Sequence, residues 1–196
     1  MEEPSKRTLE VVQPNPAAIP APLRYYDPEL QDALNTEPYD ADRFQRARAK
    51  AKQLNAAYIE ELITLAPRLS KRTLSLFSDP QEPLFDADLF EFSFGDSPQY
   101  AEARSRRRKL KFAIRATFGS FDGDSLHTLS YRGIKGLNVN VPIERWYERW
   151  GNRIDSLLSH ELTSAGDLMN HSFLFASGSA LSITFERVRW QTKRIL

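Results

Sequence analysis

The spacing of apolar residues changes from a helical period to a strand period before the middle of the chain. Between residues 40 and 66, apolar side chains recur at steps of three and four, which places them on one stripe of a helix. The members of this stripe are Phe44, Ala47, Ala51, Leu54, Tyr58, Leu62 and Leu65. Asp40 or Asp42 is a suitable N-cap, and Pro67 ends the pattern. The sequence therefore predicts one long amphipathic helix.

Two shorter helices are predicted on either side of the long one. Asp27-Pro28 has the form of a helix start, with the aspartate as cap and the proline at the first helical position. Pro38 limits this helix. A second short helix is predicted from Ser70 to Phe77.

From about Leu84 onward the apolar residues alternate with polar ones, which is typical of half-buried strands. Phe90, Phe92 and Phe94 are expected to share one face of a strand. The next strand, residues 110–118, has a basic side opposite its apolar side. We expect the apolar face to belong to the core and the basic face to be exposed to solvent. Further strands are predicted over residues 126–131 and 137–141.

The last thirty residues predict a hairpin. Two alternating segments, 171–175 and 181–185, flank the turn Ser177-Gly178-Ser179. After Phe185 the apolar parity slips by one, to Val188 and Trp190. A one-residue slip would turn the apolar face to water, so we predict a bulge near Glu186 or Arg187. The stretch from about Asn152 to His160 is predicted to be a short helix.

Helices followed by strands indicate an α+β fold, with N-terminal helices packed on one face of a mainly antiparallel sheet of about six strands. Residues 1–26 are rich in proline and are predicted to be an arm, with Leu23 among its apolar anchors. Residues 27–196 are predicted to be a single domain, with a helical part at 27–80 and a sheet part at 84–192.

Composition narrows the chemistry that this domain can perform. The chain has no cysteine, which excludes disulfides, thiol nucleophiles and thiolate metal sites. It has neither an apolar N-terminal run nor a stretch of about 20 apolar residues, so we expect a cytoplasmic protein without a membrane span. His160-Glu161 begins like the helix motif of zinc proteases, but Ser164 stands where the second histidine belongs. We therefore expect no metal and no cofactor.

Charge is distributed unevenly along the chain. Residues 1–100 hold 11 Lys/Arg and 17 Asp/Glu, whereas residues 101–196 hold 16 and 9, so the two parts carry net charges of −6 and +7. The strongest basic cluster consists of Arg104, Arg106, Arg107, Arg108, Lys109, Lys111 and Arg115. It could bind nucleic-acid phosphates without sequence specificity, or it could be a solvated loop and a strand edge protected by charge.

A second candidate binding segment contains Trp146 and Trp150, four residues apart, with Arg149 and Arg153 beside them. Tryptophan and arginine are enriched in protein-binding hot spots. If this segment is helical and exposed, it forms a protein-binding patch; if the tryptophans point inward, they belong to the core.

Four strings together resemble a family of small uncharacterised bacterial proteins. They are Leu84-Phe-Asp-Ala-Asp-Leu-Phe-Glu-Phe-Ser-Phe-Gly-Asp96, Leu129-Ser-Tyr-Arg-Gly-Ile134, His160-Glu-Leu-Thr163 and the hairpin from His171 to Phe185. The family has a His-Asp-Ala strand start, a Tyr-x-Gly strand and a His-x-Phe-Leu-Phe-Ser-Ser-Gly hairpin in this order. The chain is also similar to immunity-type proteins that neutralise polymorphic toxins. It departs from the family at Phe85, where the histidine of the His-Asp pair would stand, so Asp86 and His171 carry over as positions without roles.

Three functions follow from these patterns. The leading expectation is a non-enzymatic, immunity-like interaction protein that binds a protein partner, such as a toxin, through the wet face of the sheet or the Trp146–Trp150 segment. The alternative is a nucleic-acid-binding protein that uses residues 104–115. The second alternative is a small hydrolase in which His171 is paired with Asp86, Asp88 or Asp122.

Overall fold

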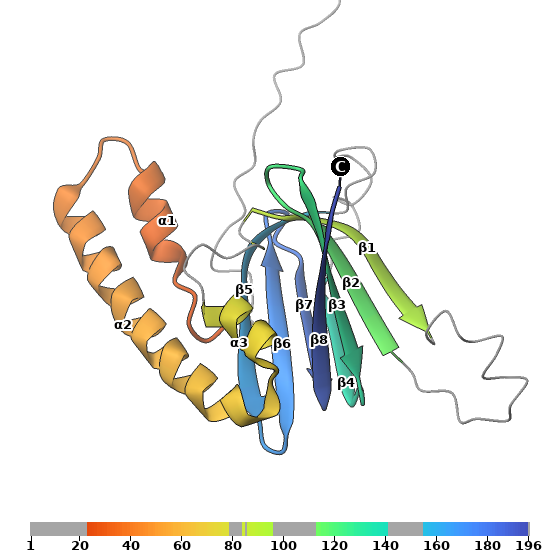
Figure 1. Ribbon diagram of the computed structural model, residues 1–196. Coiled ribbons are helices and arrows are strands. Elements are labelled where there is room, and N and C mark those ends of the chain that lie inside the picture. Colours follow the sequence, from red (N-terminus) through yellow and green to blue (C-terminus); the bar gives the residue numbers. More distant parts are fainter. Residues whose placement is uncertain (1–22, 79–83, 85, 96–112, 141–154, 196) are drawn as a thin grey trace, which may run out of the picture.

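The computed structural model describes residues 23–78, 84, 86–95, 113–140 and 155–195 (Figure 1). Over these residues the chain forms three α-helices: α1 (Pro28–Asn35), α2 (Ala41–Leu65) and α3 (Lys71–Ser78). A short 3-10 turn, η2 (Ala66–Arg68), joins α2 to α3. Eight strands follow: β1 (Asp88–Gly95), β2 (Ala113–Gly119), β3 (Ser125–Arg132), β4 (Gly136–Asn140), β5 (Asp155–Ala165), β6 (Leu168–Phe175), β7 (Ala180–Phe185) and β8 (Arg187–Arg194). The fold class is therefore α+β, with most of the described residues in the sheet.

The helix starts agree with the capping signals of the sequence. The Asp27 side chain accepts a hydrogen bond from the backbone N–H of Glu29 at 3.1 Å, and Pro28 occupies the first helical position of α1. The Asp40 side chain accepts one from the backbone N–H of Arg43 at 2.9 Å. Each carboxylate satisfies a backbone donor that has no partner inside its own helix.

The strands form one antiparallel sheet in the order β4-β7-β6-β5-β1-β2-β3-β8. β4 and β8 stand at the two ends of this order. Along the chain, however, β3 leads directly into β4 and β7 leads directly into β8, so the two ends meet. The β3–β8 ladder continues into the β4–β7 ladder through two backbone hydrogen bonds, from Lys135 N–H to Thr184 O and from Glu186 N–H to Arg132 O. The sheet is therefore curved into a ring that encloses a core.

The parity slip predicted after Phe185 occurs at Glu186. This residue is a bend between β7 and β8, so the extra residue lies between two strands instead of in a bulge within one. Because Glu186 takes up the odd residue, Phe185 on β7 and Val188 and Trp190 on β8 all face the core.

Contacts across the ring show how the core is filled. Phe118 on β2 stacks on Phe173 on β6, with ring centroids 5.7 Å apart. Tyr131 on β3 packs edge-on against Phe185 on β7 at 4.9 Å. These four rings are almost completely buried. Phe118 and Phe173 meet across the ring, whereas Tyr131 and Phe185 meet where the β3–β8 ladder continues into the β4–β7 ladder.

One expectation for β1 is corrected by its register. A bulge lies between Leu89 and Glu91, so Leu89, Phe92 and Phe94 oppose core-facing residues of β2, whereas Phe90 is turned outward and is 39% exposed. Its ring covers the backbone of Gly119, where an added Cβ would lie 2.1 Å from a Phe90 ring carbon. The three phenylalanines therefore do not share one face.

The region around residue 155 also differs from the prediction. Residues 155–165 form strand β5, not the end of a helix. The register shifts between Leu157 and Ser159, and this irregularity hides the alternation that would have identified a strand. The sheet also has eight strands instead of about six. The helices do not cover one face together, because α2 contacts β5, α3 contacts β8 and α1 packs on α2 (Figure 1).

Helix α2 takes the place of a neighbouring strand along part of β5. Among the described residues, β1 pairs with β5 only at Ser156 and Asp155. Farther along β5, the backbone N–H of Leu162 donates to Tyr58 Oη at 3.1 Å, and that of Ser164 donates to Glu61 Oε1 at 2.6 Å. Two side chains of α2 thus accept hydrogen bonds from backbone N–H groups of β5 that have no neighbouring strand to bind.

In the part of the chain that the structure describes, no helix has both the length and the apolar character required to cross a lipid bilayer.

We predict that Tyr58→Phe lowers the free energy of unfolding by about 1–2 kcal/mol, because it leaves the Leu162 N–H without its acceptor. Chemical denaturation measures this change, and hydrogen exchange should show faster exchange at the Leu162 amide. The matched control is Tyr39→Phe, since the Tyr39 side chain is exposed and its change should stay within about 0.5 kcal/mol. Equal effects of the two substitutions would contradict the role of Tyr58.

Candidate functional site

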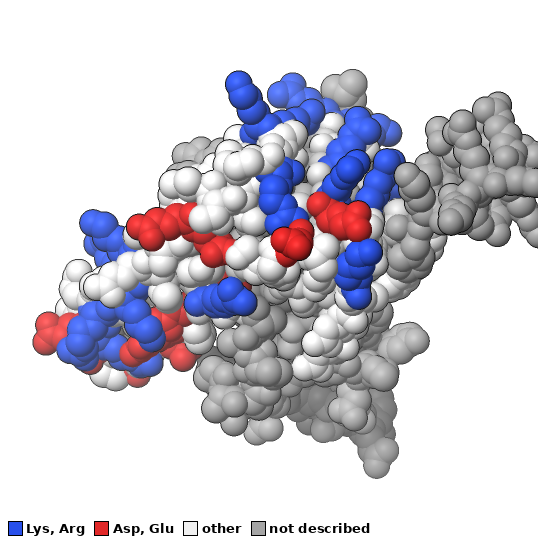
Figure 2. Space-filling view, turned by 90° about the horizontal axis from the view of Figure 1, so that it is seen from below, with Lys and Arg blue, Asp and Glu red and all other residues white. Residues whose placement is uncertain are grey.

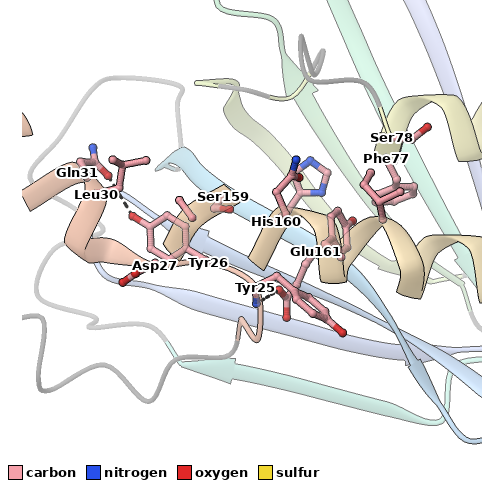
Figure 3. A pocket seen from close by; sticks show the side chains of 14 residues that line it. Tyr25, Tyr26, Asp27, Leu30, Gln31, Phe77, Ser78, Ser159, His160 and Glu161 are labelled. Carbon is pink, nitrogen blue, oxygen red and sulfur yellow. Dashed lines mark hydrogen bonds between the residues drawn. The ribbon is translucent and has the colours of Figure 1, made fainter. Parts of the chain in front are cut away.

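A cavity of about 420 Å³ lies where the helices meet β5 (Figure 3). Four parts of the chain form its walls: the segment leading into α1, the middle of α2, the end of α3, and β5. The described lining residues are Tyr25, Tyr26, Asp27, Leu30, Gln31, Ala51, Asn55, Tyr58, Ile59, Phe77, Ser78, Ser159, His160 and Glu161. Its size falls within the range of small-molecule sites in proteins.

Glu161 holds the segment before α1 against β5. Its two carboxylate oxygens accept hydrogen bonds from the backbone N–H groups of Arg24 and Tyr25, at 2.5 and 2.9 Å. Glu161 is 96% buried, and Leu23 just before this contact is also buried. Burial raises the pKa of the Glu161 carboxyl, and the two backbone donors offset part of this effect.

A chain of three buried polar side chains runs from the cavity wall into the core. His160 Nδ1 lies 2.9 Å from His171 Nε2, and His171 Nδ1 lies 2.7 Å from Tyr131 Oη. Strands β5, β6 and β3 supply one residue each. Phe77 of α3 covers the two imidazoles, with its ring centroid 5.6 Å from that of His160 and 5.1 Å from that of His171.

One assignment of the protons gives the buried hydroxyl of Tyr131 an acceptor. Tyr131 has a single hydroxyl hydrogen and is fully buried, so a buried donor would be wasted unless the hydroxyl donates to His171 Nδ1. His171 then carries its proton on Nε2 and donates to His160 Nδ1. His171 is neutral in this arrangement, and the hydrogen bonds select one of its two tautomers.

The surroundings oppose ionisation within this chain. Burial is the main reason that the pKa of His171 lies well below its ordinary value, and the neighbouring His160 lowers it further. Burial also raises the pKa of Tyr131 well above its ordinary value. Tyr131 and His171 are therefore both uncharged at physiological pH.

The third histidine lies in a separate contact. His127 Nδ1 accepts from the indole N–H of Trp190 at 3.3 Å and lies 3.2 Å from Thr192 Oγ1. Burial lowers its pKa. Since Nδ1 accepts the indole proton, the His127 proton is on Nε2.

A second surface feature lies on the outer side of β2, β3 and β8. The register places Arg115, Ser130 and Arg189 in one row across the three strands. Arg132 and Arg187 form the adjacent row, and Lys193 lies farther along β8. These five cations, which we call the basic sheet face, are Arg115, Arg132, Arg187, Arg189 and Lys193. Figure 2 shows one face of the molecule, on which many Lys and Arg side chains are exposed with some Asp and Glu side chains among them.

Most residues of the two predicted binding segments lie outside the described part of the chain. These are Arg104, Arg106, Arg107, Arg108, Lys109 and Lys111 of the basic cluster, and Trp146, Arg149, Trp150 and Arg153 of the Trp/Arg segment. Arg115 is described and lies on the outer face of β2, as the alternation of that strand predicts.

The structure does not bring His171 together with the predicted carboxylates. Both of its ring nitrogens lie at hydrogen-bond distance from Tyr131 and His160. Asp86 is exposed, Asp88 accepts from Ser156 Oγ at 2.6 Å, and Asp122 accepts from Ser120 Oγ. Within the described ranges, no group of three or more His, Asp or Glu residues has a geometry that could hold a metal ion.

Sequence reasoning missed the Tyr131–His171–His160 chain. The Ala165-Gly166-Asp167-Leu168 turn was the available signal, because a tight hairpin there pairs Leu162 with His171 and so makes His160 and His171 diagonal neighbours on one face. Predicting a helix up to His160 concealed this pairing.

Comparisons with known proteins establish no family. No protein-family model matches the sequence, and no curated protein matches it. Among solved structures, the chain is similar to an uncharacterized protein from Neisseria gonorrhoeae, with a TM-score of 0.38 and 12% sequence identity over 55% of this chain and 91% of that one.

We predict that stability is constant between about pH 7 and 9 and decreases on both sides of this range. His171 and His127 have lowered pKa values in the folded state, so the unfolded chain binds more protons below about pH 6.5 and acid favours unfolding. Tyr131 has a raised pKa, so the unfolded chain loses its proton first above about pH 10. Urea midpoints measured from pH 5 to 11 test this profile.

Tyr131→Phe separates the two limbs of this profile. It should lower the free energy of unfolding by about 1–3 kcal/mol at pH 8, because His171 Nδ1 loses its donor. It should also weaken the alkaline decrease while leaving an acid decrease. An alkaline limb as steep as that of the wild type would show that Tyr131 does not cause it.

Proposed function

We propose that this chain is a non-enzymatic, immunity-like interaction protein that binds an acidic surface of a protein partner through the basic sheet face. The single observation that carries this proposal is the arrangement of Arg115, Arg132, Arg187, Arg189 and Lys193 on three adjacent strands. Four of the five are exposed and Arg115 is partly exposed.

The geometry of a rigid sheet supports a binding role for these side chains. Neighbouring strands are about 4.8 Å apart, so the cations stand in fixed rows and need little ordering when a partner binds. Four of the five are arginines, whose planar guanidinium groups bind carboxylates with two parallel hydrogen bonds. Between them lie Thr117 and Thr128, whose hydroxyl oxygens are 3.3 Å apart and add polar groups without charge.

Apolar surface beside the cations supports a protein partner. Phe90 is 39% exposed and covers Gly119, which pairs with Leu126 on β3. Lys193 lies in the same row across the strands, and Glu91 follows Phe90 on β1 opposite Thr117, so an apolar ring stands among charged side chains here. This combination is typical of protein interfaces. The predicted Trp146, Arg149, Trp150 and Arg153 segment remains a second prediction for the partner-binding surface.

Nucleic acid is the second candidate, because the basic sheet face would neutralise phosphates and Arg115 belongs to the predicted basic cluster. Sequence-independent binding of single strands usually combines cations with several aromatic side chains on which bases stack. Among the described residues of this face, Phe90 is the only aromatic one. The described surface therefore favours a protein partner.

We predict that the double substitution Arg115→Glu/Arg189→Glu weakens the complex with the native partner at least about tenfold, equivalent to ~1.4 kcal/mol. The partner is first isolated by affinity purification from the native cell after nuclease treatment, and its affinity is then measured by calorimetry at two salt concentrations. The control is Arg46→Glu/Arg48→Glu on α2, which makes the same change in net charge at exposed positions away from the sheet.

Three results would contradict this proposal. The first is equal loss of affinity in the two double variants, and the second is unchanged affinity in both. The third is retention of a single-stranded oligonucleotide that weakens steeply with salt and is lost in Arg115→Glu/Arg189→Glu, which would favour the nucleic-acid candidate.

A further inference from the structure

The cavity beside β5 lies apart from the basic sheet face and differs from it in charge. Its described walls contain three tyrosines and a phenylalanine but no lysine or arginine. Two carboxylates, Asp27 and Glu161, also line it. A cavity with aromatic walls and acidic groups favours a cation over an anion.

The two carboxylates are not equivalent. Asp27 is already paired with Lys50, whose Nζ lies 3.0 Å from its Oδ2. Glu161 has no salt bridge to a Lys or Arg of the described ranges, and its hydrogen bonds come from backbone N–H groups, which carry no net charge. Among the described residues, Glu161 is therefore the one of these two carboxylates without a salt-bridge partner in contact, and the charge of Arg24 acts on it from nearby.

Aromatic rings stand next to this carboxylate. Tyr25 donates its backbone N–H to Glu161, and the Tyr25 ring packs against the Tyr58 ring with centroids 5.4 Å apart. Phe77 lines the cavity from α3 (Figure 3). An ammonium placed among such rings gains a cation–π attraction in addition to its attraction to the carboxylate.

Nearby acidic groups also disfavour an anion. Glu61 interacts electrostatically with both Tyr25 and Glu161, and the hydrogen bonds from Ser164 lower its pKa, so it carries a negative charge close to the cavity. Three carboxylates, Asp27, Glu61 and Glu161, thus stand against two cations, Lys50 and Arg24, so an anionic ligand is repelled and an ammonium is attracted.

We propose that this cavity binds a small organic ammonium ion, with its charge at Glu161 and its apolar body against Tyr25, Tyr58 and Phe77. A volume of about 420 Å³ accommodates a ligand of this class. The site is independent of the basic sheet face, which takes the opposite charge.

Three probes of nearly the same shape test the charge preference: phenethylamine, 2-phenylethanol and phenylacetate. Each is titrated into the full-length protein at pH 8 and followed by the backbone amide signals of Arg24 and Tyr25 in NMR spectra. We expect phenethylamine to shift these signals and to bind at least about tenfold more tightly than the alcohol, equivalent to ~1.4 kcal/mol. Phenylacetate should not bind.

Glu161→Gln tests the assigned carboxylate. Glutamine keeps an oxygen that accepts a backbone hydrogen bond but removes the charge, so the variant should lose most of the tenfold preference for the amine over the alcohol. The control Glu60→Gln makes the same charge change at an exposed position of α2 and should alter the amine affinity less than about twofold.

Binding of the alcohol or the acid as tightly as the amine would overturn the proposal, and so would an absence of amine binding. These comparisons use the wild-type protein, so they decide the question even if Glu161→Gln does not fold. Because Arg115 and Arg189 do not line the cavity, Arg115→Glu/Arg189→Glu should leave the amine affinity unchanged, and failure of one proposal is distinguishable from failure of the other.

Discussion

The rest of the structure depends on how the backbone N–H groups along the part of β5 that does not pair with β1 find hydrogen-bond acceptors. Over the described residues, β1 pairs with only the start of β5, and an edge of unpaired backbone groups is costly when it is buried. Tyr58 and Glu61 of α2 accept hydrogen bonds from this edge. Helix α2 must therefore lie along β5, and its position decides where the cavity forms and where α1 and α3 can pack.

The burial of His160 and His171 is related to the same part of the sheet, where β5 is not paired with β1. His160 lies at the edge of β5, and His171 lies behind it in the core, so their polar nitrogens have little access to water. The hydrogen bonds from Tyr131 to His160 give both nitrogens of His171 and the Nδ1 atom of His160 a partner inside the protein. Phe77 covers them, which ties α3 to the interior of the sheet.

The sequence was sufficient for features that depend on neighbouring residues. Asp27, Asp40 and Pro67 mark helix ends, and the Ser177-Gly178-Ser179 turn lies between β6 and β7 as expected, with Gly178 at a positive φ of 83° that glycine adopts without strain. The parity slip at Glu186 was also readable, because strand alternation is a local signal.

Features that depend on distant pairing could not be read in this way. The closure of the ring requires β3/β4 to pair with β7/β8, and the histidine chain requires the registers of three strands at once. In β5 and β1, bulges interrupt the alternation, so one strand was predicted as a helix and Phe90 was assigned to the wrong face. Arg115 lies on the outer face of β2 as its alternation predicted, but the other arginines of the basic sheet face, on β3 and β8, are more than ten residues away in sequence.

The contact between Glu161 and the segment before α1 has a consequence for sequence variation. Glu161 binds the main-chain amides of residues 24 and 25, not their side chains. Evolution can therefore exchange the side chain at position 24 widely while the attachment persists, but proline is forbidden there, because it has no N–H to offer. The attachment uses a backbone N–H, which every amino acid except proline has. Substitutions at position 24 therefore preserve the contact as long as Glu161 is kept.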